Sequence, residues 1–228
     1  LELLWQDLQT LGAGENAAKL PALNVEASKL ASGQPSPDVS GERLKTLQRC
    51  LAWKGRGIVA TCVQALLEPV AAPDRMRQGS ERVAVGQEYD IDALCERLAA
   101  AGYEFEVEAL AKGQASRRGG LLDVWPLTED WPARLEFFGD ALESLRRFDP
   151  AEQRSREAIK ELSIPPASDA APEGAAVAPT EYFPADASFL WLDPDAILHH
   201  FAMSAELAGR GGAESAPERD FANWRLGL

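Results

Sequence analysis

The 228-residue chain is poor in basic residues for its size. It has 23 Lys and Arg against 36 Asp and Glu, which gives a formal net charge of -13 at pH 7. A nucleic-acid duplex is polyanionic, and the proteins that bind it usually carry a basic surface. This balance argues against nonspecific DNA binding by the chain as a whole. Any contact with nucleic acid would have to come from a local basic patch.

Long apolar runs and paired cysteines are also absent. No stretch approaches the roughly 18 apolar residues of a membrane helix, so we expect no membrane partner. The cysteines are Cys50, Cys62 and Cys95, which lie far apart and form no CxxC pair. Scattered thiols in an odd number are typical of buried small residues in a reducing cytoplasm. We therefore expect a cytoplasmic protein. The chain does not begin with methionine, so we expect it to be trimmed.

No motif for catalysis or nucleotide binding is present. A phosphate-binding loop needs a glycine turn followed by Lys-Ser or Lys-Thr, and residues 12–19 (GAGENAAK) lack that ending. No GxSxG elbow and no Cys/His nucleophile pair occurs. His199 and His200 are adjacent, so on a helix they point about 100° apart and cannot clamp one metal ion. We expect no catalytic residue, no metal ligand and no cofactor in this chain.

The pattern of residues 1–79 is typical of part of an α/β domain. Leucines at helical spacing predict a helix at the start of the chain, and a second one that Ser40 caps. Residues 57–63 (GIVATCV) are continuously apolar and rich in β-branched side chains. Such a run predicts a strand buried on both faces, as in a parallel sheet. The combination of helix and buried strand favours an α/β fold.

The pattern changes to short strands over residues 80–166. A strand candidate at 82–85 precedes a helix that Asp90 caps and Gly102 ends. Strand-like segments at hairpin spacing follow, with turn signals between them, at 103–109, 120–125, 134–138, 142–148 and 159–164. We therefore predict an α+β insert with antiparallel strands.

The last part of the chain is expected to return to the first domain. Residues 167–180 are rich in Ala, Pro, Asp and Glu without a period, which is typical of a linker or long loop. Within 181–228, residues 187–192 (ASFLWL) predict a buried strand, and Asp193-Pro194 predicts a helix start. The predicted fold is thus an α/β domain with a parallel sheet, interrupted by the α+β insert.

One predicted strand of the insert has the composition of a binding surface. Strand alternation places Arg134, Glu136 and Phe138 on one face, with Leu135 and Phe137 on the other. An aromatic side chain beside an arginine on a polar sheet face is typical of an interface hot spot. The alternative is that a second small element covers Phe138 and buries it.

Three segments of the insert resemble a known family. Residues 118–124 (RGGLLDV) and 134–140 (RLEFFGD) resemble the second domain shared by the excinuclease subunit UvrB and bacterial transcription-repair coupling factors. Residues 148–155 (FDPAEQRS) are closer to the coupling factors. Segments 58–61 and 189–194 resemble their first α/β domain and the return into it, so the resemblance covers nearly the whole chain.

The resemblance implies a fold and a function. The first domain would be a degenerate relative of a RecA-like helicase motor domain that has lost its nucleotide loop. The insert would dock the excinuclease subunit UvrA, the damage-recognition protein of nucleotide excision repair. The two arginines and the phenylalanine that lead this contact map onto Arg118, Arg134 and Phe138. RNA polymerase, DNA, ATP and magnesium would be bound by parts of a translocase parent outside this chain.

Two alternatives remain open. The chain could be a fragment of the excinuclease subunit UvrB, which would need a phosphate loop and a tyrosine-rich hairpin. It could also be a nucleic-acid-binding module that uses a cluster of arginines, namely Arg117, Arg118, Arg146, Arg147, Arg154 and Arg156. Net acidity and the lack of an aromatic platform beside a continuous basic groove argue against the second alternative.

Overall fold

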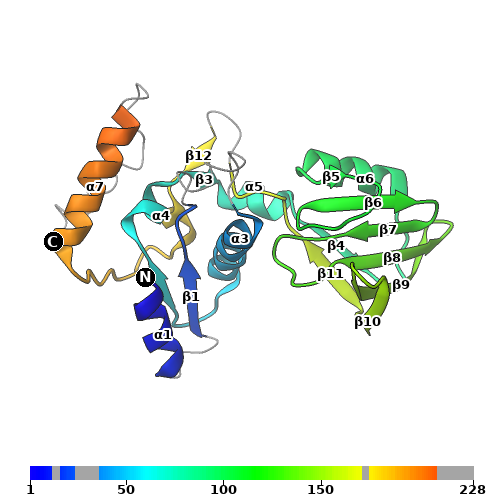
Figure 1. Cartoon of the computed structure of the whole chain (residues 1–228), viewed down its shortest axis with the longest axis horizontal. Helices are drawn as coiled ribbons and strands as arrows, with labels where there is room; N and C mark the ends of the chain where they lie inside the picture. Colours follow the sequence, from blue (N-terminus) through cyan, green and yellow to red (C-terminus); the bar gives the residue numbers. More distant parts are fainter. Residues whose placement is uncertain (12–15, 24–35, 171–174, 210–228) are drawn as a thin grey trace. The chain divides into compact units, whose positions relative to one another are not determined.

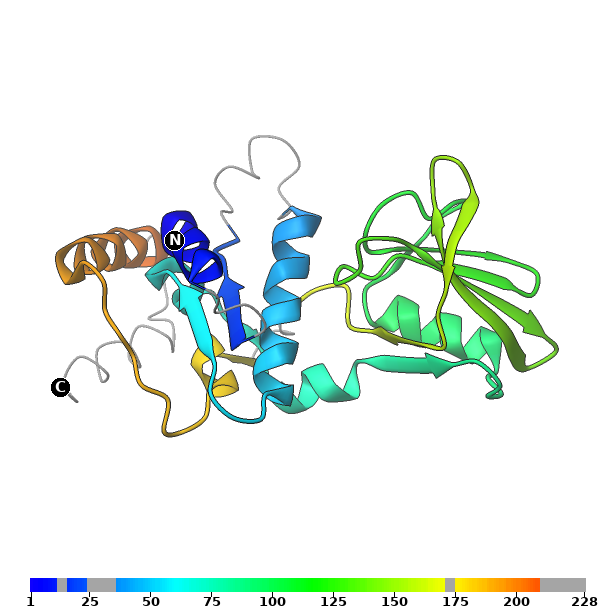
Figure 2. The same ribbon diagram turned by 90° about the horizontal axis from the view of Figure 1, so that it is seen from below.

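The computed structural model describes residues 1–11, 16–23, 36–170 and 175–209, which fold into two units (Figures 1 and 2). Leu1–Pro73 and Ala170–Leu228 make up the first unit, and Asp74–Asp169 the second. Helices and strands are mixed in both, and most strand pairs are antiparallel. This agrees with the predicted mixed α/β class. In the described segments, no helix is long and apolar enough to cross a membrane.

The first unit contains a parallel strand pair joined by a helical crossover. Strands β1 (Ala17–Leu20) and β2 (Ile58–Thr61) run parallel, and α3 (Pro37–Ala52) lies between them in the sequence and packs on β1. A second pair, β3 (Val70–Ala71) and β12 (Ala176–Val177), is antiparallel. The other helices described in this unit are α1 (Glu2–Thr10), α4 (Val63–Leu67), η2 (Pro179–Tyr182) and α7 (Pro194–Gly209).

Several predictions for this unit need correction. Helix α3 begins at Pro37, after Ser36, because proline suits the first helical position, so the predicted cap at Ser40 is wrong. Strand β2 is shorter than predicted, and Ile58 is exposed, so it is not buried on both faces. The predicted strand at 187–192 is also wrong. That segment has an irregular backbone, and Leu190 is 86% exposed.

Other predictions for the first unit are confirmed or stay open. The helix after Asp193-Pro194 is confirmed as α7. The parallel-sheet motor domain stays a prediction, since the strands described in this unit form two-stranded sheets. Residues 12–15 of the segment considered as a phosphate loop, and 171–174 of the predicted linker, lie outside the described residues.

A six-stranded sheet dominates the second unit, in the order β10-β9-β8-β7-β6-β5. All neighbouring strands pair antiparallel except β5 and β6. The strands are β5 (Glu104–Phe105), β6 (Gln114–Arg118), β7 (Leu121–Val124), β8 (Ala133–Phe138), β9 (Ala141–Asp149) and β10 (Arg154–Ala158). A separate antiparallel pair consists of β4 (Glu81–Ala84) and β11 (Glu161–Ile164), and the helices are α5 (Pro73–Gln78) and α6 (Ile91–Ala100).

The core of the second unit lies on one face of this sheet. Helix α6 lies against that side of the sheet in Figure 2. The side chain of Asp90 caps α6 by accepting hydrogen bonds from the amides of Asp92 and Ala93, and Gly102 follows its end with a φ of +93°. Apolar residues from α6, β4 and β11 pack on the inward side chains of the sheet, and they include Val83, Leu94, Leu98, Leu122, Leu135, Leu145 and Leu162.

The strands of the insert were predicted unevenly. Those at 120–125, 134–138, 142–148 and 159–164 are confirmed as β7, β8, β9 and β11. The segment at 103–109 forms a strand only over β5. Strands β6 and β10 were missed. All five residues of β10 are exposed, so its sequence carries no apolar alternation that could reveal it.

Candidate protein-docking site

The predicted site residues share the polar face of the six-stranded sheet. Core residues such as Leu122 and Leu135 alternate along their strands with side chains that point to the opposite face. Asp123 lies directly opposite Arg134 in the neighbouring strand. Arg118 ends β6, and Phe138 ends β8. The strand register therefore brings all three predicted residues to one face of one sheet.

A buried carboxylate joins the two arginines. Asp123 is only 3% exposed, although it is charged. Arg134 donates to it in a bidentate manner, from Nε to Oδ1 at 2.7 Å and from a terminal nitrogen to Oδ2 at 2.7 Å. Arg118 donates to the same Oδ2 at 3.2 Å. The Asp123 side chain thus holds two guanidinium groups. Their hydrogen bonds and positive charges offset the cost of burying the carboxylate.

The turn after β9 holds Arg134 from its other side. The Nη2 of Arg134 also donates to the side-chain oxygen of Gln153, which lies in this turn, at 2.9 Å. The guanidinium carbon lies 4.5 Å from the centre of the Phe148 ring, within the range of a cation–π contact. The hydrogen bond to Asp123 raises the pKa of Arg134 above its ordinary value. Arg134 is therefore a fixed cation with a side chain that is only 13% exposed.

Phe138 is the apolar member of the site. Its neighbour Phe137 packs against the core and makes an edge-on contact with Tyr89, with ring centres 6.4 Å apart. Phe138 is 78% exposed and lies where β8 turns into β9 through Gly139, which has a φ of +61°. Within the described segments, the alternative that another element buries Phe138 is wrong.

The glycine turn beside Arg118 serves the fold as well as the site. Gly119 has a φ of +61°, and a Cβ there would meet no atom within 4 Å. At Gly120, a Cβ would lie 2.7 Å from the carbonyl oxygen of Phe137. The missing side chain at Gly120 therefore lets the β6–β7 turn approach the end of β8. Arg118 stays accessible, with 47% of its side chain exposed.

Sequence reasoning missed Asp123 and Gln153 on this face, and it considered Arg146 only as a member of the arginine cluster. Arg146 pairs with Glu136, and Glu136 also accepts from Ser144. A signal for Asp123 was present, because an acidic residue within the apolar strand LLDV indicates a buried cationic partner. Gln153 gave no such signal, since it lies in the turn after β9 and bonds a residue nineteen positions earlier.

The arginine cluster considered for nucleic-acid binding is paired with carboxylates. Each of its arginines has an Asp or Glu oxygen within 4 Å, and the partners are Asp92 for Arg117, Asp123 for Arg118, Glu136 for Arg146, Glu157 for Arg147, Glu152 for Arg154 and Asp149 for Arg156. Phosphate binding by the whole cluster would have to replace all six of these ion pairs. This arrangement speaks against the nucleic-acid alternative.

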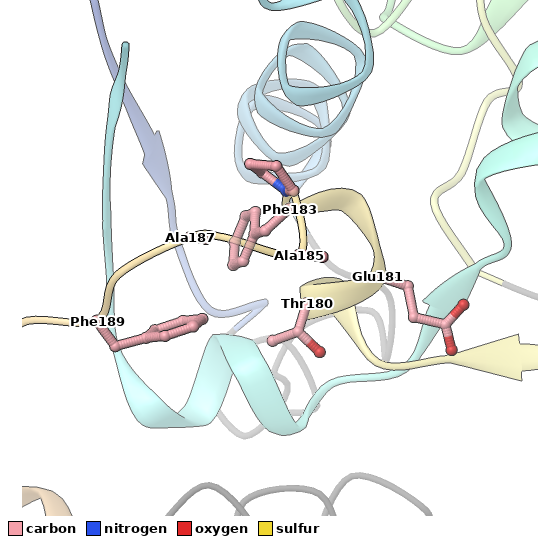
Figure 3. A pocket seen from close by; sticks show the side chains of 7 residues that line it. Thr180, Glu181, Phe183, Ala185, Ala187 and Phe189 are labelled. Atoms are coloured by element: carbon pink, nitrogen blue, oxygen red, sulfur yellow. The ribbon is translucent and has the colours of Figure 1, made fainter. Parts of the chain in front are cut away.

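A shallow pocket in the first unit offers little for chemistry. Its volume is about 210 Å³, and Figure 3 shows its lining, which is Thr180, Glu181, Phe183, Pro184, Ala185, Ala187 and Phe189. The rings of Phe183 and Phe189 lie 6.1 Å apart, and only two of the lining side chains are polar. Among the described residues, no group of three or more His, Cys, Asp or Glu side chains is placed to hold a metal ion.

Comparison with known proteins finds the family that the segments of the insert resemble. Residues 82–169 match the UvrB interaction domain. The transcription-repair-coupling factor of Myxococcus xanthus is 40% identical over 153 residues, which is 66% of this chain and 12% of the relative. Those of Bacillus subtilis (30% over 165 residues) and Escherichia coli (32% over 146 residues) cover 72% and 64% of this chain.

The chain spans only 12% to 14% of the length of these relatives. The domain match includes every residue of the polar face described above, from Arg118 to Gln153. Residues 82–169 are therefore a UvrB interaction domain, and over about two thirds of its length the chain is similar to bacterial transcription-repair-coupling factors, as its sequence indicated.

Proposed function

We propose that the second unit is a protein-docking module that recruits the excinuclease subunit UvrA to stalled RNA polymerase, within a transcription-repair-coupling factor, and that this chain is not itself catalytic. The observation that carries the proposal is the arrangement of Arg118, Arg134 and Phe138 on one exposed sheet face inside a UvrB interaction domain. A face with two ion-paired arginines and one exposed aromatic ring has the composition of a hot spot.

The chemistry of the face predicts what its partner presents. Phe138 offers a large apolar side chain that is mostly exposed, so it gains most by entering an apolar recess. Arg118 offers guanidinium donors at the same end of the sheet, and these pair best with a carboxylate. We therefore infer a partner surface in which an apolar recess adjoins an acidic side chain.

The remaining functions of a coupling factor are assigned to other parts of the parent protein. We propose that the first unit is a degenerate relative of a helicase motor domain, a view that the parallel β1–α3–β2 crossover supports. Binding of ATP and magnesium, translocation on DNA and contact with RNA polymerase would belong to the parent outside this chain. A fragment of the excinuclease subunit UvrB is the second candidate, and the names of the relatives favour the coupling factor.

Titration calorimetry of the chain with purified UvrA tests the proposal. We expect the wild-type chain to bind, and Phe138→Ala to weaken binding by about 30-fold, since loss of a hot-spot side chain costs about 2 kcal/mol. Leu3→Ala is the matched control, because Leu3 is also 78% exposed but lies on α1 of the first unit. Its affinity should equal that of the wild type.

Two results would contradict the docking assignment. One is the absence of binding by the folded wild-type chain. The other is equal affinity of Phe138→Ala and the wild type. A filter-binding assay with random duplex DNA, at low and physiological salt, tests the nucleic-acid alternative separately. Tight binding that weakens steeply with salt would favour that alternative instead.

A further inference from the structure

We propose that Asp123 is a positioning residue of the docking face, which fixes the orientation of Arg118 and Arg134 toward the partner without touching the partner itself. This inference rests on the proposed function. Asp123 is 3% exposed, so a partner cannot reach its carboxylate while the two arginines cover it. Its influence on binding must therefore pass through the groups that it holds.

Arg134 and Arg118 differ in how many of their N–H donors are already used within the chain. A guanidinium has five N–H donors. Arg134 uses its Nε–H and both N–H groups of Nη2, on Asp123 and Gln153. In the part of the chain that the structure describes, its Nη1 donates to no other group. Arg134 thus presents one edge of its guanidinium, and the orientation of that edge is set by the Asp123 carboxylate.

Arg118 is held more loosely and presents more donors. Only its Nη2 donates to Asp123, at 3.2 Å, and its side chain is 47% exposed. A weaker ion pair joins its Nη1 to Glu108 at 3.9 Å. Without the Asp123 carboxylate, this long side chain would sample many rotamers, and its ordering would oppose binding. Holding it in place before the partner arrives reduces that cost.

Two features of the fold prevent Asp123 from moving with its arginines. The residue lies in β7, between β6 and β8, and both of its neighbours in sequence, Leu122 and Val124, are buried core residues. Arg134 is also stacked on Phe148 and hydrogen-bonded to Gln153, and these contacts hold its guanidinium group beside Asp123. The arrangement is a rigid template for two cations at a set spacing.

Asp123→Asn tests this inference, because the amide keeps the shape of the side chain and removes its charge and one acceptor. We expect the affinity for UvrA to fall at least about tenfold. The same substitution placed in an Arg118→Ala/Arg134→Ala chain should change affinity no further, because nothing is left for Asp123 to position. Glu129→Gln is the matched control, since Glu129 pairs with Arg147, on the other side of the sheet.

A spectroscopic measurement checks whether Asp123 holds Arg134 in solution. The side-chain Nε–H signal of Arg134 should be protected from solvent exchange in the free wild-type chain, and it should lose that protection in Asp123→Asn. If Asp123→Asn does not fold, this wild-type measurement decides, since fast exchange of the Arg134 signal would overturn the inference. A folded Asp123→Asn chain with wild-type affinity would overturn it as well.

The outcomes also separate this inference from the proposed function. If the folded wild-type chain does not bind UvrA, the proposed function fails. If the wild type binds and the effect of Asp123→Asn persists undiminished without the two arginines, the proposed function stands and the positioning role fails.

Discussion

Gly120 and Phe137 lie against each other where β7 meets β8. The amide of Phe137 donates to the carbonyl of Gly120 at 2.8 Å, and a Cβ on Gly120 would lie 2.7 Å from the carbonyl oxygen of Phe137. The docking face thus depends on a close approach between two backbones, next to Arg118 and Phe138. In the segment RGGLLDV, Gly120 is therefore required for this close packing and not only for the turn.

Gly120→Ala is expected to destabilise the second unit by about 1–3 kcal/mol, because the methyl group must push the backbone of β8 away. Gly119→Asn is the control at the neighbouring position. Asparagine tolerates the positive φ of Gly119, and the space there is open, so stability should change by less than about 0.5 kcal/mol. Urea unfolding followed by circular dichroism measures both. Equal stability of the two variants would contradict the close-approach account.

Phe137→Ala and Phe138→Ala should differ sharply in their effects on folding. Phe137 packs against the core, so its truncation should cost roughly 3 kcal/mol. Phe138 is exposed, so its truncation should change the free energy of unfolding by less than about 0.5 kcal/mol. Chemical denaturation of the two variants checks this pair. A large loss of stability in Phe138→Ala would place that side chain in a core and remove it from the docking face.

Arg134→Ala is expected to reduce stability more than Arg118→Ala does. Removal of Arg134 leaves the buried Asp123 with only the long hydrogen bond from Arg118, and this loss of partners should cost about 2 kcal/mol. Removal of Arg118 leaves the bidentate pair intact, and a half-exposed ion pair contributes about 1 kcal/mol or less. Thermal unfolding of both variants at neutral pH measures the difference. Equal melting temperatures would mean that Asp123 is not held as described.

The second unit should fold when it is produced alone as residues 74–169. Its core cluster is drawn from within these residues, from Val83 to Ile164. Such a unit is expected to unfold cooperatively, because it has its own hydrophobic core. A single sigmoidal melting transition and dispersed amide resonances would agree with this. A molten fragment without a transition would show that the first unit is needed for folding.

Cys50 should react slowly with thiol reagents at neutral pH. Its partial burial raises the pKa of the thiol to about 11, since desolvation disfavours the thiolate. The thiol of the unfolded chain ionises nearer pH 9, so the stability associated with this group is complete below pH 9 and is lost as the pH rises toward 11. Alkylation followed by mass spectrometry measures the rate. Fast modification of Cys50 in the folded chain at pH 8 would contradict the raised pKa.

Features that depend on neighbours in the sequence could be predicted before the structure was known. Helix α6 follows from the Asp90 cap, whose hydrogen bonds reach amides two and three residues away. Strand β8 follows from apolar alternation, which assigns each side chain to a face without knowledge of the partner strand. The same alternation placed Arg134 and Phe138 on one face.

Features that depend on pairing between distant segments were decided only by the tertiary structure. Residues 187–192 are apolar enough for a strand, but a strand exists only where a neighbour accepts its backbone hydrogen bonds. Strand β10 has no apolar face, and it forms because its backbone pairs with that of β9. Asp123 meets Arg134 because the β7–β8 register aligns residues eleven positions apart. The sequence by itself determined which side chains of β8 face outward, and the strand register determined which side chains of neighbouring strands contact one another, because hydrogen-bonded pairing is a property of two segments and not of one.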